Sequence, residues 1–335
     1  MSFLTSLIPW ISSAIVYGTV IMFGALGEIL TEKSGHLNLG VPGLMFLGAF
    51  SSFATAYFYE NSTETPSKAL LILLPLAVGF IVSSLGGLLY SFLTDILRAN
   101  QNVTGLALTS FGVGIGTFGG VYICKVFGSG TYVKATVTSA AFSANLNASL
   151  GLGSIGQLLL SYGFLTYVAI ILAIVMQVFF NKTRIGLNLR AIGENPATAD
   201  AAGINVTKYK MLATTLGGGI CGLGGVYYVL VYALGGWTTQ NNIEGLGWLA
   251  VALVIFATWK PANTIWGSYL FALLFWLYAY FPTLTKIKLT NSTTDLLKAI
   301  PYVVTIIVLV TVSMRRKRES QPPESLGRAY FREER

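Results

Sequence analysis

Charged residues are scarce in this chain: they make up 10% of its 335 residues, whereas a typical soluble domain carries about 25%. Histidine occurs once and cysteine twice, too few for the common zinc sites. The sequence also lacks the P-loop, H-E-x-x-H and G-x-S-x-G motifs. We therefore expect a chain that is not an enzyme, does not itself hydrolyse ATP, and holds neither a metal nor a cofactor.

The chain contains several long segments without any charged residue. No Asp, Glu, Lys or Arg lies between Ala135 and Asn181, between Gly35 and Tyr59, or from Met211 to Ile243. A helix of about 20 apolar residues crosses a bilayer, and these segments are long enough. They predict a polytopic membrane protein. A soluble enzyme or nucleic-acid-binding domain is excluded, although the net charge is +8.

The apolar runs are continuous rather than alternating, which predicts an all-α protein with about eight to ten transmembrane helices. The predicted spans are Ile8–Leu30, Leu39–Tyr59, Ala69–Leu93, Val103–Phe127, Leu158–Phe180, Met211–Leu234, Leu246–Trp259, Ala262–Phe281 and Leu296–Met314. Two spans are candidates for discontinuous helices, because Leu39–Tyr59 opens with glycine and proline and Leu246–Trp259 is short and stops at a proline. A tilted, kinked helix explains either segment equally well.

Basic residues concentrate in two segments, Asn181–Lys210 and Arg315–Arg335, each with a net charge of +3. Cytoplasmic loops are enriched in Lys and Arg, so both segments are predicted to be cytoplasmic. We expect a transmembrane domain over 1–314, with an outer loop at 128–157, followed by a disordered basic tail over 315–335. The side on which the N-terminus lies depends on whether Leu39–Tyr59 crosses the membrane or re-enters.

Two G-x-G-x-x-G matches begin at Gly114 and Gly217, but both lie inside charge-free apolar runs. A dinucleotide site needs a preceding strand and a following acidic residue, so close helix packing is the better interpretation. Small residues recur every fourth position in both runs and form faces that let helices approach closely. The two faces are Ala213, Gly217, Cys221 and Gly225, and Gly112, Gly116 and Gly120.

The basic segment 181–210 contains the pattern of a short helix. Asn195 can cap it, Pro196 suits its first position, and Gly203 can end it. These residues predict an amphipathic helix of about seven residues at the membrane surface. Such a helix either binds anionic lipid or docks a soluble partner, and the pattern alone leaves both open.

Three stretches resemble one transporter family. Residues 186–204, GLNLRAIGENPATADAAGI, look like the coupling segment of permease subunits in the ribose, branched-chain amino acid and nucleoside group of ABC importers. Residues 27–49 are similar to that family's G-E-x(n)-S-G-x-L-N-L-G-x-E-G-x-M-x-x-G-A signature, with Pro42 where the family usually has an acid. Residues 242–263 resemble its G-x-G-x-x-x-I-A-V-A-L…P stretch.

The coupling segment, the S-G-x-L-N-L-G form and the long outer loop look closest to nucleoside-type permeases, which pair two different permease subunits. The resemblance implies a permease of the plasma membrane that pairs with a second permease and with two ABC ATPase subunits. It would receive a small neutral substrate, which we expect to be a purine nucleoside, from a membrane-anchored binding lipoprotein. A permease for ribose-type sugars and an ion-coupled secondary carrier are the alternatives.

The resemblance and the polar residues at membrane depth give two sets of candidate site residues. Those expected to couple to the ATPase are Arg190, Gly193, Glu194, Asn195, Pro196, Asp200 and Gly203. Those expected along the substrate pathway are Asn38, Gln101, Asn102, Trp237, Gln240 and Asn241. Amides can hydrogen-bond ribose hydroxyls or base edges, and an indole can stack on a base. Alternatively, Asn38 and Asn102 only cap helices, and Trp237 belongs to the interfacial aromatic belt.

Overall fold

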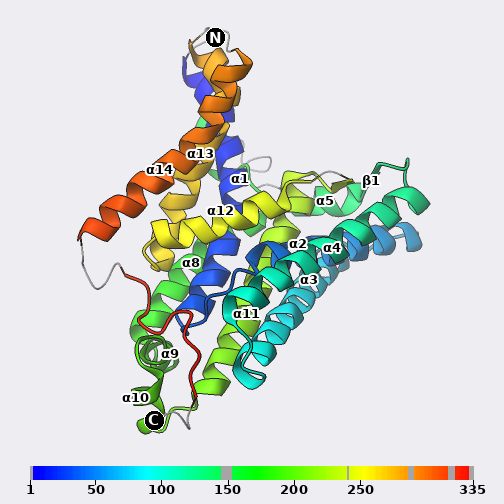
Figure 1. Cartoon of the computed structure of the whole chain (residues 1–335). Coiled ribbons are helices and arrows are strands. Elements are labelled where there is room, and N and C mark those ends of the chain that lie inside the picture. Colours follow the sequence, from blue (N-terminus) through cyan, green and yellow to red (C-terminus); the bar gives the residue numbers. More distant parts are fainter. Residues whose placement is uncertain (1–2, 145–152, 240, 286–289, 316–320, 332–335) are drawn as a thin grey trace.

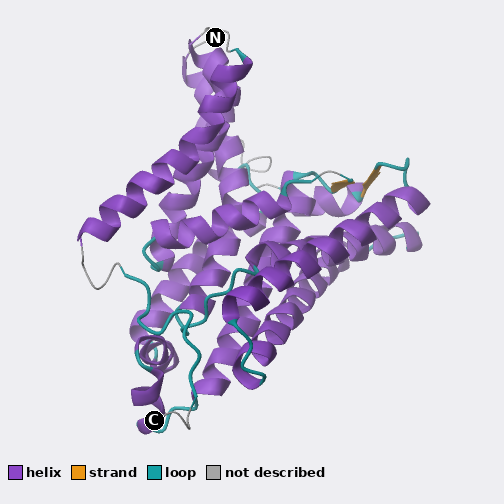
Figure 2. Cartoon of the chain, in the orientation of Figure 1, coloured by secondary structure: helices purple, strands orange, loops and turns teal. Residues whose placement is uncertain are grey.

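The computed structural model describes residues 3–144, 153–239, 241–285, 290–315 and 321–331, and most of them are helical (Figure 1, Figure 2). The long helices are α1 (Phe3–Glu32), α2 (Val41–Ser62), α3 (Lys68–Ser91), α4 (Gln101–Phe127), α8 (Phe164–Lys182), α11 (Val206–Tyr227), α13 (Pro261–Thr285) and α14 (Asn291–Arg315). The short helices are α5 (Thr136–Phe142), α7 (Gly153–Leu160), α9 (Arg184–Glu194), α10 (Pro196–Ala201) and α12 (Ile243–Phe256). The π-helical turns η1 (Phe92–Ile96) and η2 (Tyr228–Tyr232) extend α3 and α11.

Helices of membrane-spanning length confirm the expected all-α, polytopic class. Among the described residues, seven helices are long and apolar enough to cross a bilayer, and α12 is a shorter apolar helix. Helix α14 covers the ninth predicted span. The predicted outer loop also contains a strand, β1 (Tyr132–Lys134), which pairs antiparallel with β2 (Gly236–Thr238). Residues 145–152 of that loop lie outside the described residues.

Helix α2 is continuous over 22 residues, so its glycine and proline residues do not interrupt it. Gly40 is instead the residue before its first turn, and Pro42 lies in that turn, where its missing N–H is not needed. The irregular backbone at this place is the loop 33–40, most of which is buried. Protein can satisfy the polar groups of such a loop at membrane depth. Helix α12 is short, and two left-handed residues, Thr258 (φ 51°) and Trp259 (φ 53°), follow it.

The small-residue faces pack as predicted. A side chain on Gly217 would meet the backbone of Gly27 in α1, and one on Gly112 would meet the backbone of Gly43 in α2. The Cys221 thiol reaches the carbonyl of Gly24 at 3.4 Å. Helices α1 and α11, both largely buried, therefore form the centre of the bundle, with α2, α3, α12 and α13 around them.

Different elements of the chain lie at the two ends of the bundle. The end of α13, the start of α14 and the described N-terminal end lie together at one end, while α9, α10 and the C-terminal segment lie at the other (Figure 1). Helices α3 and α4 run side by side along the flank of the bundle (Figure 1). The basic segment that contains α9 and α10 and the C-terminal segment are thus at the same end.

The C-terminal segment differs from the expected disordered tail, because residues 321–331 pack against the protein. The Ser325 amide donates to the Gly193 carbonyl at 3.0 Å, and the Gly327 amide donates to the Gly35 carbonyl at 3.2 Å. Both acceptors belong to glycines, which have no side chain to keep a second strand of chain away. A polar segment stays disordered when it lacks such partners, and here long-range contacts supply them. Residues 316–320 and 332–335 lie outside the described residues.

Candidate functional site

Helices α9 and α10 form a helical element between α8 and α11, and side-chain caps define its boundaries. The Thr183 hydroxyl accepts from the Gly186 amide at 3.1 Å at the start of α9. The Asn195 side chain accepts from the Thr198 amide at 3.0 Å at the start of α10, with Pro196 at its first position. Gly203 follows α10 with a φ of 83°. The predicted short helix is therefore confirmed, whereas α9 was not predicted.

Gly193 joins this element to the rest of the protein. A Cβ atom on Gly193 would collide with the carbonyl oxygen of Lys33, so only glycine allows this approach. On its other side, Gly193 accepts hydrogen bonds from the amide of Ser325 at 3.0 Å and from its hydroxyl at 2.6 Å. The buried Gly193 is thus held between the loop 33–40 and the C-terminal segment.

The other expected coupling residues surround Gly193 on the outside of the element. Arg190, Glu194, Asn195 and Gly203 are exposed. The half-buried Asp200 accepts a hydrogen bond from the Tyr330 hydroxyl at 2.9 Å. The structure therefore brings the expected coupling residues together on one element, with most of their polar groups accessible to a partner.

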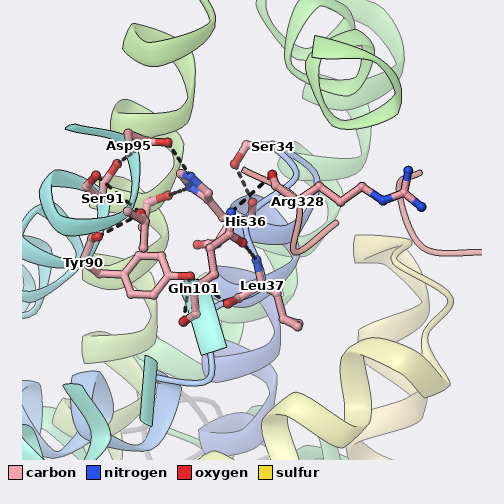
Figure 3. Close-up of polar contacts among 11 residues, drawn as sticks. Ser34, His36, Leu37, Tyr90, Ser91, Asp95, Gln101 and Arg328 are labelled. Carbon is pink, nitrogen blue, oxygen red and sulfur yellow. Dashed lines mark hydrogen bonds and ion pairs between the residues drawn. The ribbon is translucent and has the colours of Figure 1, made fainter. Parts of the chain in front are cut away.

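The loop 33–40 contacts three helices through His36 and Leu37 (Figure 3). The buried His36 ring lies 2.8 Å from Asp95 Oδ1 through Nε2 and 2.8 Å from the Thr214 hydroxyl through Nδ1. The Leu37 carbonyl accepts from the Tyr90 hydroxyl at 2.7 Å, and the Leu37 amide donates to Gln101 Oε1 at 2.9 Å. The loop is thereby fixed to α3 with its π-turn, to α4 and to α11. We call His36, Asp95, Tyr90, Gln101 and Thr214 the polar hub.

The charge of the polar hub depends on His36. Burial lowers the pKa of His36, and the hydrogen bond and negative charge of Asp95 offset part of this effect. The Ser91 hydroxyl donates to the second Asp95 oxygen at 2.6 Å, which keeps the carboxylate facing the ring (Figure 3). A neutral imidazole that donates from Nε2 to Asp95 and accepts from Thr214 satisfies every one of these groups.

A pair of buried carboxyl groups lies at the end of α1. Glu28 and Glu32 are both buried and lie four residues apart on α1, about one helical turn from each other. Glu28 accepts from the Asn38 amide at 3.2 Å, and Glu32 accepts from the Trp259 indole. Among the described residues, neither forms an ion pair within 4.0 Å. The second oxygen of Glu28, Oε2, is buried without a hydrogen-bond partner among the described residues.

The expected pathway residues fall into two groups at opposite ends of α4. Asn38 is buried beside the carboxyl pair, Gln101 belongs to the polar hub, and Asn102 is exposed at the start of α4. Trp237 packs against Gly120, which lies 19 residues after Gln101, or roughly 28 Å along the helix. These two groups therefore cannot contact one small solute together. Gln240 lies outside the described residues.

Trp237 and Asn241 line a small cavity of about 210 Å³ between β2, η2 and the start of α12. The rings of Phe46, Phe50 and Phe53 surround Trp237, and its side chain is 2% exposed. The Asn241 side-chain oxygen is buried without a hydrogen-bond partner among the described residues. The cavity thus combines an aromatic wall with an acceptor that lacks a donor.

Sequence reasoning missed the polar hub and the carboxyl pair. The hub joins residues up to 178 positions apart, and no local pattern links them. The carboxyl pair did have a signal, since acids four residues apart on an apolar helix lie on the same face.

Comparison with known families agrees with this architecture. The sequence profile of the family described as branched-chain amino acid transport system / permease component matches residues 10–309. The chain belongs to this permease family. It is therefore a permease of an ABC importer, a non-catalytic transmembrane subunit that works in general with ATPase and binding-protein partners.

Curated relatives in the permease family cover most of the chain. A nucleoside ABC transporter permease protein of Lactococcus lactis is 30% identical over 89% of this chain and 90% of its own length. A guanosine ABC transporter permease protein of Bacillus subtilis is 30% identical over the same shares. A putative glucose ABC transporter permease protein of Haloferax volcanii is 32% identical over 82% of this chain and 77% of its own length. No solved structure matches the chain.

Proposed function

We propose that this permease imports nucleosides, with purine nucleosides as the expected substrates, and that it forms one half of a heterodimeric pathway. Two relatives that align over nine tenths of their length are named for nucleoside or guanosine transport, which supports this substrate class. Another relative is named for glucose transport, so ribose-type sugars remain the alternative substrate class. In this proposal a binding lipoprotein delivers the substrate, and two ATPase subunits supply the energy.

The contact between Gly193 and Lys33 carries the proposed mechanism. When the ATPases close, they push on α9 and α10 through the exposed Arg190 and Glu194. Because Gly193 lies directly against the backbone of Lys33, the push reaches the loop 33–40 without a flexible side chain in between. That loop is bonded to α3, α4 and α11 through the polar hub, so these helices move with it.

The substrate pathway is proposed to pass the cavity lined by Trp237 and Asn241. A ligand site usually needs about 300–1,000 Å³, and this cavity holds about 210 Å³. The second permease subunit and the opening motion would supply the remaining space. The pathway side chains named here are uncharged, which suits a neutral nucleoside.

The common position of α9, α10 and the C-terminal segment supports the proposed orientation. Each of the two basic segments carries a net charge of +3, and their described parts contact each other. We therefore assign this end of the bundle to the cytoplasm, in a protein of the plasma membrane.

Membership of the ABC permease family replaces the earlier alternative of an ion-coupled secondary carrier, so only the substrate class remains to be tested. To test the substrate, the chain is reconstituted with its partner permease, ATPases and binding lipoprotein, and ATP hydrolysis is measured with guanosine, adenosine, cytidine, ribose or glucose. We expect purine nucleosides to stimulate hydrolysis most. Stimulation by ribose or glucose alone would overturn the nucleoside assignment.

A further inference from the structure

A second pocket, with a volume of about 660 Å³, opens at the end of the bundle that contains α9. Its lining includes three cations, Lys33, Arg190 and Lys260, and one acid, Glu194. The three cations come from three different segments of the chain, so the fold and not the local sequence gathers them. We call this the basic pocket.

The positive charges gathered in the basic pocket disfavour one another, and this affects Lys33. Burial, followed by the positive charge of Arg190, lowers the pKa of Lys33 to about 8. Among the described residues, the Lys33 ammonium forms no ion pair within 4.0 Å. An anion bound between these groups would relieve the repulsion.

The remaining lining residues suit an oxyanion. The pocket adjoins Pro261, the first residue of the 25-residue helix α13, whose N-terminal end carries partial positive charge. Gln177 accepts from the Ala262 amide at 3.2 Å through its side-chain oxygen, so its amide nitrogen remains as a further donor. A guanidinium and two ammonium groups in the lining of one pocket are the donors that bind the oxygens of a phosphate group.

The depth of the basic pocket indicates where the phosphate comes from. Lys33 directly follows the α1 span, Asn181 lies at the end of the α8 span, and Lys260 directly precedes the α13 span. The pocket therefore lies where three spanning helices end, at the level of lipid headgroups. Val178 on α8 and Trp266 on α13 follow the lining residues Gln177 and Pro261 by one and five positions. They are 50% and 52% exposed, which gives acyl chains an apolar surface on the same two helices.

We propose that the basic pocket binds a phosphate group, presented by the headgroup of an anionic phospholipid in the leaflet at this end of the bundle. Basic pockets between transmembrane helices bind such headgroups in other proteins. Binding joins the ends of α1, α8 and α13 next to α9, and it needs neither the ATPases nor a particular transported substrate.

The test is a titration of the purified full chain in neutral detergent, followed by native mass spectrometry. Phosphatidylglycerol and phosphatidylcholine are compared for the natural chain and for the double variant Lys33→Gln/Lys260→Gln. We expect the natural chain to prefer phosphatidylglycerol and the double variant to bind it at least about tenfold more weakly. Lys182→Gln is the matched control, since Lys182 is an exposed cation near the pocket but does not line it.

Two further arms decide between the possible outcomes. Unchanged phosphatidylcholine binding and an unchanged elution volume show that the double variant is folded. The conservative variant Lys260→Arg should keep the preference for phosphatidylglycerol. In the second arm, inorganic phosphate at millimolar concentration is added to the natural chain. If it displaces phosphatidylglycerol, the pocket binds the phosphate group itself, and soluble phosphate is a second source of that group. Equal binding of both lipids to the natural chain, or an equal loss in Lys182→Gln, would overturn the proposal and indicate only diffuse attraction.

Discussion

Ser325 donates two hydrogen bonds to the carbonyl oxygen of Gly193, one from its amide at 3.0 Å and one from its hydroxyl at 2.6 Å. These residues are 132 positions apart, and their contact fixes the C-terminal segment to the element that we propose receives the ATPase. The same carbonyl belongs to the residue that lies against Lys33. The C-terminal segment therefore holds Gly193 on the side opposite to its proposed coupling contact with Lys33.

Removal of the C-terminal segment should loosen α9 and α10. We expect a chain that ends at residue 320 to show faster hydrogen exchange in these helices, because the bonds to Gly193 and Asp200 are lost. Ser325→Ala should have a smaller effect, near the 0.5–1.5 kcal/mol of about one hydrogen bond. A chain that ends at Phe331 retains these bonds and is the control. Equal exchange in the two truncated chains would contradict the contact.

The buried carboxyl pair predicts different outcomes for two substitutions of Glu28. Glu28→Gln keeps a side-chain oxygen that can accept from the Asn38 amide, so the free energy of unfolding should change by less than about 0.5 kcal/mol. Glu28→Ala leaves the buried Asn38 amide without its acceptor, which should cost about 1–3 kcal/mol. Thermal unfolding in detergent measures both. If Glu28→Gln is as destabilising as Glu28→Ala, acceptance from the Asn38 amide is not what Glu28 contributes to stability.

His36 predicts a pH dependence of stability. Its pKa is lowered in the folded protein, so the unfolded chain binds more protons just below its ordinary pKa of about 6.5. The free energy of unfolding should therefore fall as the pH decreases through this range. The chain has no other histidine. His36→Gln should flatten the slope measured by thermal unfolding, and Asp95→Asn should steepen it. Identical slopes in the natural chain and His36→Gln would contradict this assignment.

The cavity beside Trp237 predicts a specific effect of Asn241 on transport. Asn241→Ala should raise the KM for nucleoside uptake about three- to tenfold, the equivalent of one lost hydrogen bond. The neighbouring Asn242 has an exposed side chain outside this cavity, so Asn242→Ala is the matched control. If both variants have the natural KM, the cavity is not on the pathway.

Local patterns predicted much of this molecule. The Asn195 cap, Pro196 and Gly203 predicted α10, and the spacing of small residues predicted which faces of α4 and α11 pack closely. Contacts between distant segments were not predictable, because no periodicity connects His36 with Asp95 or Ser325 with Gly193. The C-terminal segment has the composition of a disordered tail, and its partners, such as the Gly193 and Gly35 carbonyls and Asp200, come together only in the folded protein.

The measurement that tests the central claim is the number of nucleosides imported per ATP hydrolysed, in proteoliposomes that contain the complete complex. ATP should drive import by the natural chain when ionophores have removed every ion gradient. Gly193→Val should keep ATP hydrolysis but lower this ratio about fivefold or more. Gly130→Asn lies outside the coupling element, at a position with a positive φ where a Cβ meets no atom within 4 Å, and should leave the ratio unchanged. An unchanged ratio in Gly193→Val, or import by the chain alone driven by an ion gradient, would contradict the account.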